Sequence, residues 1–215
     1  METFETGATV QALGLKVGGL SDTSKMPCLS WSIPASECKT GSKLRDVEGS
    51  TCSHCFAMKG RYPLTNVQTA MHRRLRALRE NASWVDDMVA VIGRSEKSGY
   101  FRWFDSGDIQ SADHLRKIIS IASRLPHIRF WLPTREYCIV EEVRSDGPFP
   151  DNLTIRLSAH MIDGPLPTAL AKRMGVVVSG VTRGIPTCPS AKQNNKCGAC
   201  RACWDSKQPV TYGLH

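Results

Sequence analysis

The cysteines are the residues of this sequence whose types and spacing could do chemistry. Nine occur in 215 residues. Four of them lie near the end of the chain: Cys188, Cys197, Cys200 and Cys203. Thiolates are soft ligands that select zinc, copper(I) or iron–sulfur clusters. The sequence therefore predicts a metal site in this region, bound by these four side chains.

The spacing of this C-terminal group favours an iron–sulfur cluster. Cys197, Cys200 and Cys203 are separated by two residues each, and Cys188 is followed at once by Pro189. These are spacing elements of bacterial ferredoxins, in which closely spaced thiolates and a remote Cys-Pro hold 4Fe-4S clusters. Zinc usually takes two well-separated Cys-x2-Cys pairs, so zinc is the alternative metal.

A second group of cysteines lies far upstream: Cys38, Cys52 and Cys55. Three thiolates can hold three irons of a 4Fe-4S cluster and leave the fourth iron open to a substrate. Alternatively, Cys28 or His54 supplies a fourth protein ligand. We therefore expect one or two 4Fe-4S clusters in the protein.

The elements that must position these residues alternate regularly along the middle of the chain. Strands are expected in residues 99–108, 128–134, 153–164 and 175–181. Helices are expected in residues 67–78, 83–92, 111–126, 135–143 and 166–174. This alternation predicts an α/β fold with right-handed βαβ units. Four strands are too few for a closed eight-stranded barrel, so we expect a partial (βα) barrel or an open parallel sheet.

We expect a single domain over residues 1–215, divided into three parts. Residues 1–65 are a cysteine-containing region without clear periodicity, expected to form metal-binding loops held by something other than a sheet. Residues 66–183 are the α/β core, and residues 184–215 are the cysteine-rich, metal-binding tail.

Polar residues follow the predicted strands at the edge where folds of this class bind ligands, the carboxyl ends of the strands. The candidate ligand-binding residues there are Asp105, Ser106, Asp108, Thr134, Arg135 and His160. Asp108 could instead cap the helix that follows, as Ser111 could. A lone histidine such as His160 is more often structural or on the surface.

Charge and hydropathy limit the classes of partner. The net charge is +8, and part of the excess lies in a predicted helix, on Arg73, Arg74, Arg76 and Arg79. This helix is either a solvated face or a contact surface for a host protein or nucleic acid. No apolar run is long enough to span a membrane. The start of the chain lacks the pattern of a signal peptide, so we expect a cytoplasmic protein.

Several cysteine and aromatic side chains have simpler interpretations. We expect four of them to belong to the core: Trp103, Phe130, Trp131 and Cys138. Trp31 and Trp204 are each near a cysteine group in the sequence and could shield a cluster from water.

The sequence resembles the phage gene-product-88 family from about Met26 to Trp204. The resemblance rests on "LSWSIPASEC", "CSHCFAMKG", "FRWFDSGDI" and the cysteine-rich tail. The family usually has Tyr at the position of Phe56, and Cys28 is additional. This resemblance implies a phage protein that acts in the cytoplasm of the infected host cell.

A more distant resemblance is to radical S-adenosylmethionine enzymes, which carry three cysteines in a loop ahead of a partial barrel. Their Gly-Gly-Glu turn after the second strand binds the amino group of the methionine moiety. Here "FDSGDI" has that place, with Asp108 as the acid. The resemblance implies S-adenosylmethionine as a cofactor. This sequence departs from the compact family spacing, since Cys38 lies fourteen positions before Cys52.

Two functional hypotheses follow. The first is an iron–sulfur protein, in the form of a radical S-adenosylmethionine-like enzyme. The second is a non-catalytic protein stapled by an iron–sulfur cluster or zinc, which binds a host protein or nucleic acid.

Overall fold

The structure, a computed structural model, describes residues 8–205 and 207–214. Its α-helices are α1 (Val10–Lys16), α2 (Lys39–Leu44), α3 (Thr65–Glu80), α4 (Trp84–Ser95), α5 (Ala112–Arg124), α6 (Tyr137–Arg144), α7 (Thr168–Met174) and α8 (Ala202–Asp205). Short 3-10 helices span Ala35–Glu37 (η1), Phe56–Met58 (η2) and Pro189–Lys192 (η3). The strands are β1 (Ser21–Asp22), β2 (Leu29–Trp31), β3 (Tyr100–Trp103), β4 (Arg129–Thr134), β5 (Leu153–Ser158), β6 (Val177–Thr182) and β7 (Val210–Gly213).

The strands lie side by side in chain order, from β1 to β7, in one sheet. β1 is antiparallel to β2, whereas β2 to β7 are all parallel. Consequently the carboxyl ends of β2 to β7 lie along the same edge. Within the described residues β1 and β7 do not pair, so the sheet is open. The predicted α/β fold is confirmed, and of the two architectures expected, a partial (βα) barrel or an open parallel sheet, the structure shows an open, mostly parallel sheet.

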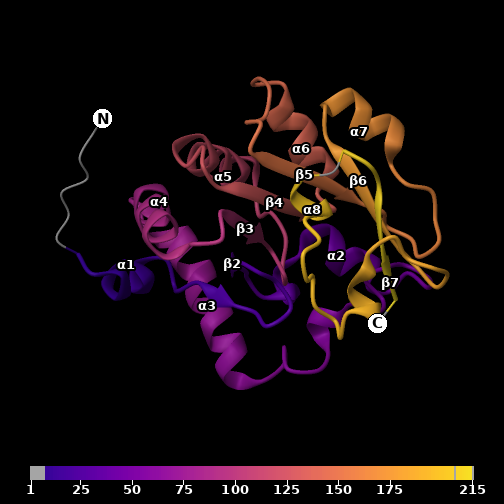
Figure 1. Cartoon of the computed structure of the whole chain (residues 1–215), viewed down its shortest axis with the longest axis horizontal. Helices are drawn as coiled ribbons and strands as arrows, with labels where there is room; N and C mark the ends of the chain where they lie inside the picture. The colour runs from indigo at the N-terminus through magenta and orange to yellow at the C-terminus, as the bar shows by residue number, and fades with distance from the viewer. Residues whose placement is uncertain (1–7, 206, 215) are drawn as a thin grey trace.

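Alternate residues of each strand face opposite sides of the sheet. Phe130 and Leu132 of β4 are buried in the larger core, to which α4 to α7 also contribute. Trp131, between them, faces the other side and packs against Trp204 of α8. We call the side with Phe130 and Leu132 the helix face, and the side with Trp131 the tail face. Figure 1 shows α4, α5, α6 and α7 in a row along the sheet, with α8 over the middle strands.

Three tryptophans anchor the helix-face core. Trp31 of β2 contacts Trp84 of α4 and Trp103 of β3, with ring centroids 5.3 and 6.0 Å apart. The indole Nε1 of Trp31 donates to Val17 O at 2.9 Å. Trp31 therefore belongs to this core, and its expected role as a shield for the cysteines is wrong. Trp204 does lie with cysteines, as expected, because it packs beside Cys203 on the tail face.

The sequence pattern missed three strands. The sheet has seven strands in the described residues, where four were predicted. β1, β2 and β7 span only two, three and four residues, too short to show a period of two. The expectation that residues 1–65 form only loops is wrong, because β2 pairs with β3 and places Trp31 in the core. The single-domain division stays a prediction.

Two side chains lie elsewhere than predicted. Cys138, expected in the core, is exposed, because α6 turns Val140 and Val143 toward the sheet instead. Arg74, expected on an exposed basic face, is buried and donates from Nε to Gly19 O at 2.9 Å. The core assignments of Trp103, Phe130 and Trp131 are confirmed.

No helix among the described residues is long and apolar enough to cross a membrane.

Candidate metal and ligand sites

The three upstream cysteines lie together at the carboxyl edge of the sheet. Cys38 comes from the segment after β2, and Cys52 and Cys55 lie in the turn before η2. Gly41 of α2 lies against the first two, since a Cβ there would be 3.6 Å from Cys38 Sγ and 3.5 Å from Cys52 Sγ. Cys55 N donates to Cys52 O at 3.2 Å, which keeps these two cysteines on one turn. A glycine at position 41 leaves the space between the thiols open.

Glu136 fixes the first part of this cysteine region to the end of β4. Its buried carboxylate accepts hydrogen bonds from Thr40 N and Thr40 Oγ1, both at 2.8 Å. Two hydrogen bonds to one residue hold the start of α2, and with it Cys38, over the strand end. Glu136 was missed as a site residue, although it lies in the "LPTRE" strand end.

The second part of the cysteine region is fixed to the end of β5. Thr51 N donates to His160 O at 2.8 Å, and Thr51 Oγ1 donates to Ala159 O at 3.2 Å. Thr51 directly precedes Cys52, so two hydrogen bonds from Thr51 to backbone carbonyls position this thiol without using the side chain of His160.

Asp108 organises the strand ends from a buried position. Its Oδ1 accepts from Thr134 Oγ1 at 2.6 Å and from Ile109 N at 2.8 Å, and its Oδ2 accepts from Arg135 N at 2.9 Å. The side chain therefore links the ends of β3 and β4. It does not cap α5, because the N-cap residue is Ser111, whose Oγ accepts from His114 N.

Asp105 and Ser106 are also buried at the end of β3. Asp105 Oδ2 accepts from Tyr62 Oη at 3.3 Å. Asp105 Oδ1 and Ser106 Oγ have no hydrogen-bond partner among the described residues. Buried polar atoms without partners are rare in proteins, so this corner of the edge has unused capacity to bind a polar ligand.

Arg135 and His160 are the last of the polar residues at the carboxyl ends of the strands, which we call the strand-end rim. Arg135 Nε is a buried donor without a hydrogen-bond partner in the part of the chain described. His160 Nε2 lies 3.4 Å from Arg135 O, and the His160 ring stacks on Tyr137 with centroids 4.5 Å apart. Asp108, Thr134, Arg135 and His160 thus form one connected group.

The charged residues of the strand-end rim shift the pKa values of the upstream cysteines. Burial raises the pKa of Cys38, and the nearby carboxylate of Asp108 raises it further, whereas Arg135 lowers it. Burial also raises the pKa of Cys52, and Arg135 opposes that shift. For Asp108, burial raises the pKa to about 6, although the hydrogen bonds from Thr134 and Arg135 lower it. Thiols, carboxylate and guanidinium therefore share one environment.

The tail cysteines form a separate group on the tail face. Cys203 is buried with Met26, Trp131 and Trp204, and Cys188 and Cys197 pack against this cluster. Burial raises the pKa of Cys203 to about 11, while the hydrogen bond with Tyr212, at 3.3 Å, lowers it. Cys200 is the member of the predicted tail set that lies outside this packed group.

Cys28 belongs with the tail cysteines. It is buried in the same cluster as Cys203, and burial raises its pKa to about 12, with Cys197 among the charges that act on it. His54, the other candidate fourth ligand of the upstream group, has an exposed side chain.

The geometry of both groups is that of free thiols. All nine cysteines are unpaired. In residues 8–205 and 207–214, no three Cys, His, Asp or Glu side chains are arranged around a common point as in a ready-made metal site. The donor chemistry fits a thiolate-bound metal in each group, and metal binding stays a prediction.

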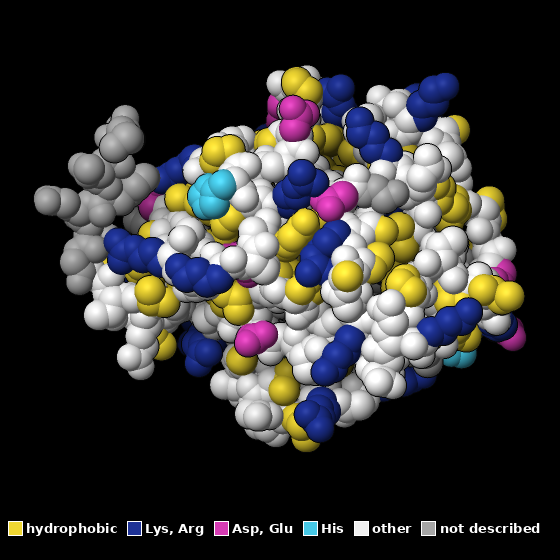
Figure 2. Space-filling view, in the orientation of Figure 1, with side chains coloured by type: hydrophobic (Ala, Val, Ile, Leu, Met, Phe, Trp, Pro, Cys, Tyr) yellow, Lys and Arg dark blue, Asp and Glu magenta, His cyan; other side chains and the backbone are white. Residues whose placement is uncertain are grey.

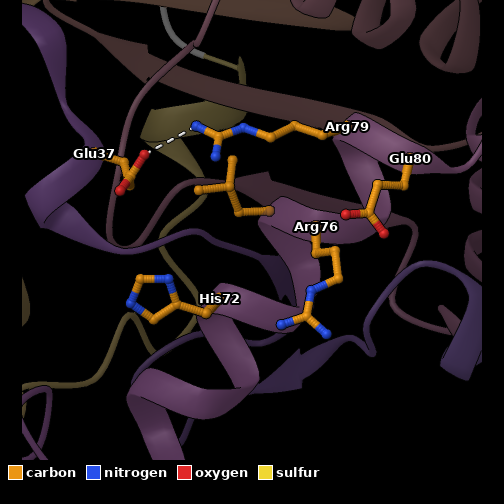
Figure 3. Close-up of a pocket in the computed structure, with 6 residues that line it drawn as sticks. Glu37, His72, Arg76, Arg79 and Glu80 are labelled. Atoms are coloured by element: carbon orange, nitrogen blue, oxygen red, sulfur yellow. Dashed lines mark hydrogen bonds and ion pairs between the residues drawn. The ribbon is translucent and has the colours of Figure 1, made fainter.

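The basic helix α3 lines a small pocket of about 220 Å³ beside η1. Figure 3 shows Arg79 reaching across to Glu37, an ion pair of 2.9 Å, while His72 and Arg76 lie lower on the same helix. Arg73 Nε donates to Gly18 O at 3.1 Å. These contacts, with the burial of Arg74, leave α3 without a continuous free arginine face.

Comparisons with known proteins place the chain in a family. No curated protein and no solved structure gives a significant match to the sequence. The family described as Gene product 88 matches residues 5–206, which is most of the chain and includes both cysteine groups. The protein therefore belongs to the phage gene product 88 family.

Proposed function

We propose that this phage protein is an iron–sulfur protein whose upstream site, Cys38, Cys52 and Cys55, binds a cluster beside the polar residues at the strand ends. The observation that carries the proposal is the placement of Cys38 and Cys52 around Gly41, in electrostatic contact with Asp108 and Arg135. A cluster held by three thiolates supplies redox chemistry and one iron that is open to a small molecule.

The residues around this site suit a ligand with amino and carboxylate groups, as S-adenosylmethionine has. Arg135 has an unused buried Nε–H that can donate to a carboxylate. Asp105 Oδ1 is an unused buried acceptor for an ammonium group. Asp108 already accepts three hydrogen bonds, which leaves one of about four lone-pair positions free. Asp105 is therefore a second candidate, beside Asp108, for the acid that binds the amino group.

The experiment is anaerobic purification followed by iron and sulfide analysis, then electron paramagnetic resonance of the reduced protein with and without S-adenosylmethionine. We expect the spectrum to change on addition. Cys52→Ser should lose the responsive signal, while Cys138→Ser, at an exposed site outside both groups, should retain it.

A second candidate function is a non-catalytic, metal-stapled binding protein. It is favoured by exposed apolar side chains that follow Cys55, namely Phe56 (45% exposed), Met58 (43%) and Leu64 (51%). A basic pair, Lys59 and Arg61, is exposed among them. Figure 2 shows Lys and Arg side chains interspersed with hydrophobic ones over the visible face. A full iron complement with no spectral response to S-adenosylmethionine would support this candidate and reject the enzyme.

A further inference from the structure

We infer that the tail holds a second metal site of four thiolates in which Cys28 is a ligand, together with Cys188, Cys197 and Cys203. This site is independent of the upstream cysteines and of the function proposed for them. The ligand class is a metal centre that prefers thiolates, either an iron–sulfur cluster or zinc.

The first observation is that three separate parts of the chain meet in one packed cluster. Cys28 and Cys203 are both buried in the tail-face cluster, and Cys188 and Cys197 pack against it. Cys197 N donates to Lys25 O at 2.9 Å, so the loop that includes residue 197 is held against the segment before Cys28. Cys188 N donates to Thr211 O at 3.0 Å, which fixes Cys188 beside β7.

The second observation is the rigid support of Cys203. Arg156 of β5 is fully buried, and it donates to Ala202 O at 2.7 Å and to Cys203 O at 3.1 Å. On the other side of that residue, Trp204 Nε1 donates to Phe101 O at 2.8 Å. The backbone around Cys203 is therefore held to the sheet, as a preorganised ligand would need.

The third observation is positive charge beside the cluster that contains these thiols. Arg102 of β3 lies over the Trp131 ring, 4.3 Å from its centroid, and donates to Met26 Sδ at 3.2 Å. Arg156 approaches the same cluster from β5. Arg156 also donates to four backbone carbonyls, so it has a structural role as well. Four thiolates around a metal would carry net negative charge, which these two guanidinium groups would offset.

Two hydroxyl groups are positioned to bond to the sulfurs. Tyr212 Oη lies 3.3 Å from Cys203 Sγ, and Ser190 Oγ lies 3.3 Å from Cys188 Sγ. Hydrogen bonds to ligand sulfurs are a usual means of tuning a metal centre. Cys200, by contrast, lies in the half-buried turn after Cys197 and outside the cluster. Cys200 is as half-buried as Cys188 and Cys197, so what selects Cys28 as the fourth ligand is that it packs inside the cluster whereas Cys200 does not.

The test uses the full chain with the upstream group silenced by Cys38→Ser, Cys52→Ser and Cys55→Ser, so that only the tail can bind. The probe is anaerobic titration with Co²⁺, whose thiolate charge-transfer absorption grows with the number of bound thiolates. In this background we expect a four-thiolate spectrum. Cys28→Ser should weaken Co²⁺ binding at least tenfold and reduce the thiolate absorption, whereas Cys200→Ser and the exposed control Cys138→Ser should not.

Cys28→Ala, judged by circular dichroism without metal, separates lost ligation from lost folding, because it keeps a small apolar side chain in the cluster. A folded Cys28→Ala variant that binds Co²⁺ like its parent would overturn the inference. So would loss of binding in Cys200→Ser alone. Iron, sulfide and zinc analysis of the same background, purified anaerobically, identifies which metal the site takes in cells. The converse background, with the tail thiols replaced, tests the upstream site separately.

Discussion

His114 is a titratable residue that is buried in the helix-face core. Its side chain is 2% exposed, and its Nδ1 accepts from Gln110 N at 3.3 Å, which places the ring proton on Nε2. Tryptophan and phenylalanine rings surround it, with the Trp84 centroid 5.8 Å away. Burial lowers the pKa of His114 from 6.5 to about 3. The folded protein therefore holds this histidine neutral at pH values where the unfolded chain would protonate it.

This predicts acid sensitivity that a substitution at position 114 removes. Because the folded-state pKa lies below the unfolded value, the contribution of His114 is complete above pH 6.5 and is lost as the pH falls toward 3. Over that range the free energy of unfolding should fall by up to about 1.4 kcal/mol per pH unit. Urea unfolding from pH 7 to pH 4 should show a shallower pH dependence for His114→Gln. The exposed His127→Gln variant should keep the slope of the wild type, and equal slopes for His114→Gln would contradict the assignment.

Gly107 is a residue with no tolerance for a side chain. Its φ is +84°, and a Cβ would lie 2.3 Å from Ile33 Cγ1 and 2.7 Å from Ile33 O. The close approach of the chain after β3 to the chain after β2 depends on it, and both chains lead to the candidate site.

We expect Gly107→Ala to destabilise the protein by at least about 2 kcal/mol, from backbone strain and steric overlap together. Gly14→Ala is the matched control, because Gly14 is in helix α1 and a Cβ there has no neighbour within 4 Å. The control should be neutral or slightly stabilising. Thermal unfolding of the two variants distinguishes them, and similar melting temperatures would show that the approach to Ile33 is less tight than described.

At the scale of elements, the short helix α2 depends on a contact with another part of the chain. It has six residues and no side-chain N-cap hydrogen bond, so it gains little from its own sequence. The carboxylate of Glu136 supplies two acceptors at its first turn. The position of Cys38 is therefore decided by a residue 98 positions later in the chain.

Glu136→Gln should loosen α2 without unfolding the sheet. Both hydrogen bonds can still form, because Thr40 Oγ1 can accept from the amide NH2, but they lose the negative charge of the acceptor. Charge-assisted hydrogen bonds are roughly twice as strong as neutral ones, so we expect α2 to lose about 1 kcal/mol. Hydrogen exchange at the amides of residues 39–44 should become faster by the factor that this loss in the free energy of local unfolding gives. Glu141→Gln, which affects only a surface ion pair with Arg173, should not change exchange in α2. Protection of α2 equal to that of the wild type would show that the helix is held by other contacts.

At the scale of the whole molecule, the sheet separates two cores of different kinds. The helix-face core is large and apolar. The tail-face cluster is smaller and is formed largely by residues 188–212 folding back over the strands. Adjacent residues of β4 belong to different cores: Phe130 is fully buried on the helix face, and Trp131 is 5% exposed on the tail face.

The two cores should respond differently to truncation of these neighbours. Phe130→Ala leaves a cavity in the main core and should lower the free energy of global unfolding by about 3–5 kcal/mol. Trp131→Ala removes the contact with Trp204 and should chiefly speed hydrogen exchange in α8 and β7. Denaturant unfolding and hydrogen exchange on both variants test this. Equal protection of the tail in both variants would mean that it unfolds only with the whole protein.

The sequence alone determined the central α/β alternation and the approximate position of β3 to β6, because those strands and helices are long enough to show a period. It also identified Cys38, Cys52, Cys55 and the strand-end rim as candidates, since cysteine spacing and strand ends are local features. The positions of Asp108 beside Thr134 and Arg135 then followed from parallel strands ending at one edge.

Only the tertiary structure decided the partners that come from distant parts of the chain. β2 and β7 are strands because neighbours complete their hydrogen bonds, and no local pattern marks segments of three or four residues. Glu136 belongs to the site because it accepts hydrogen bonds from Thr40. Arg74 is buried and donates a hydrogen bond to Gly19 O. Cys28 joined the tail group rather than the upstream one for the same reason. Spacing along the chain limits which thiols can meet within one loop, but packing across the sheet decides which thiols meet from different loops.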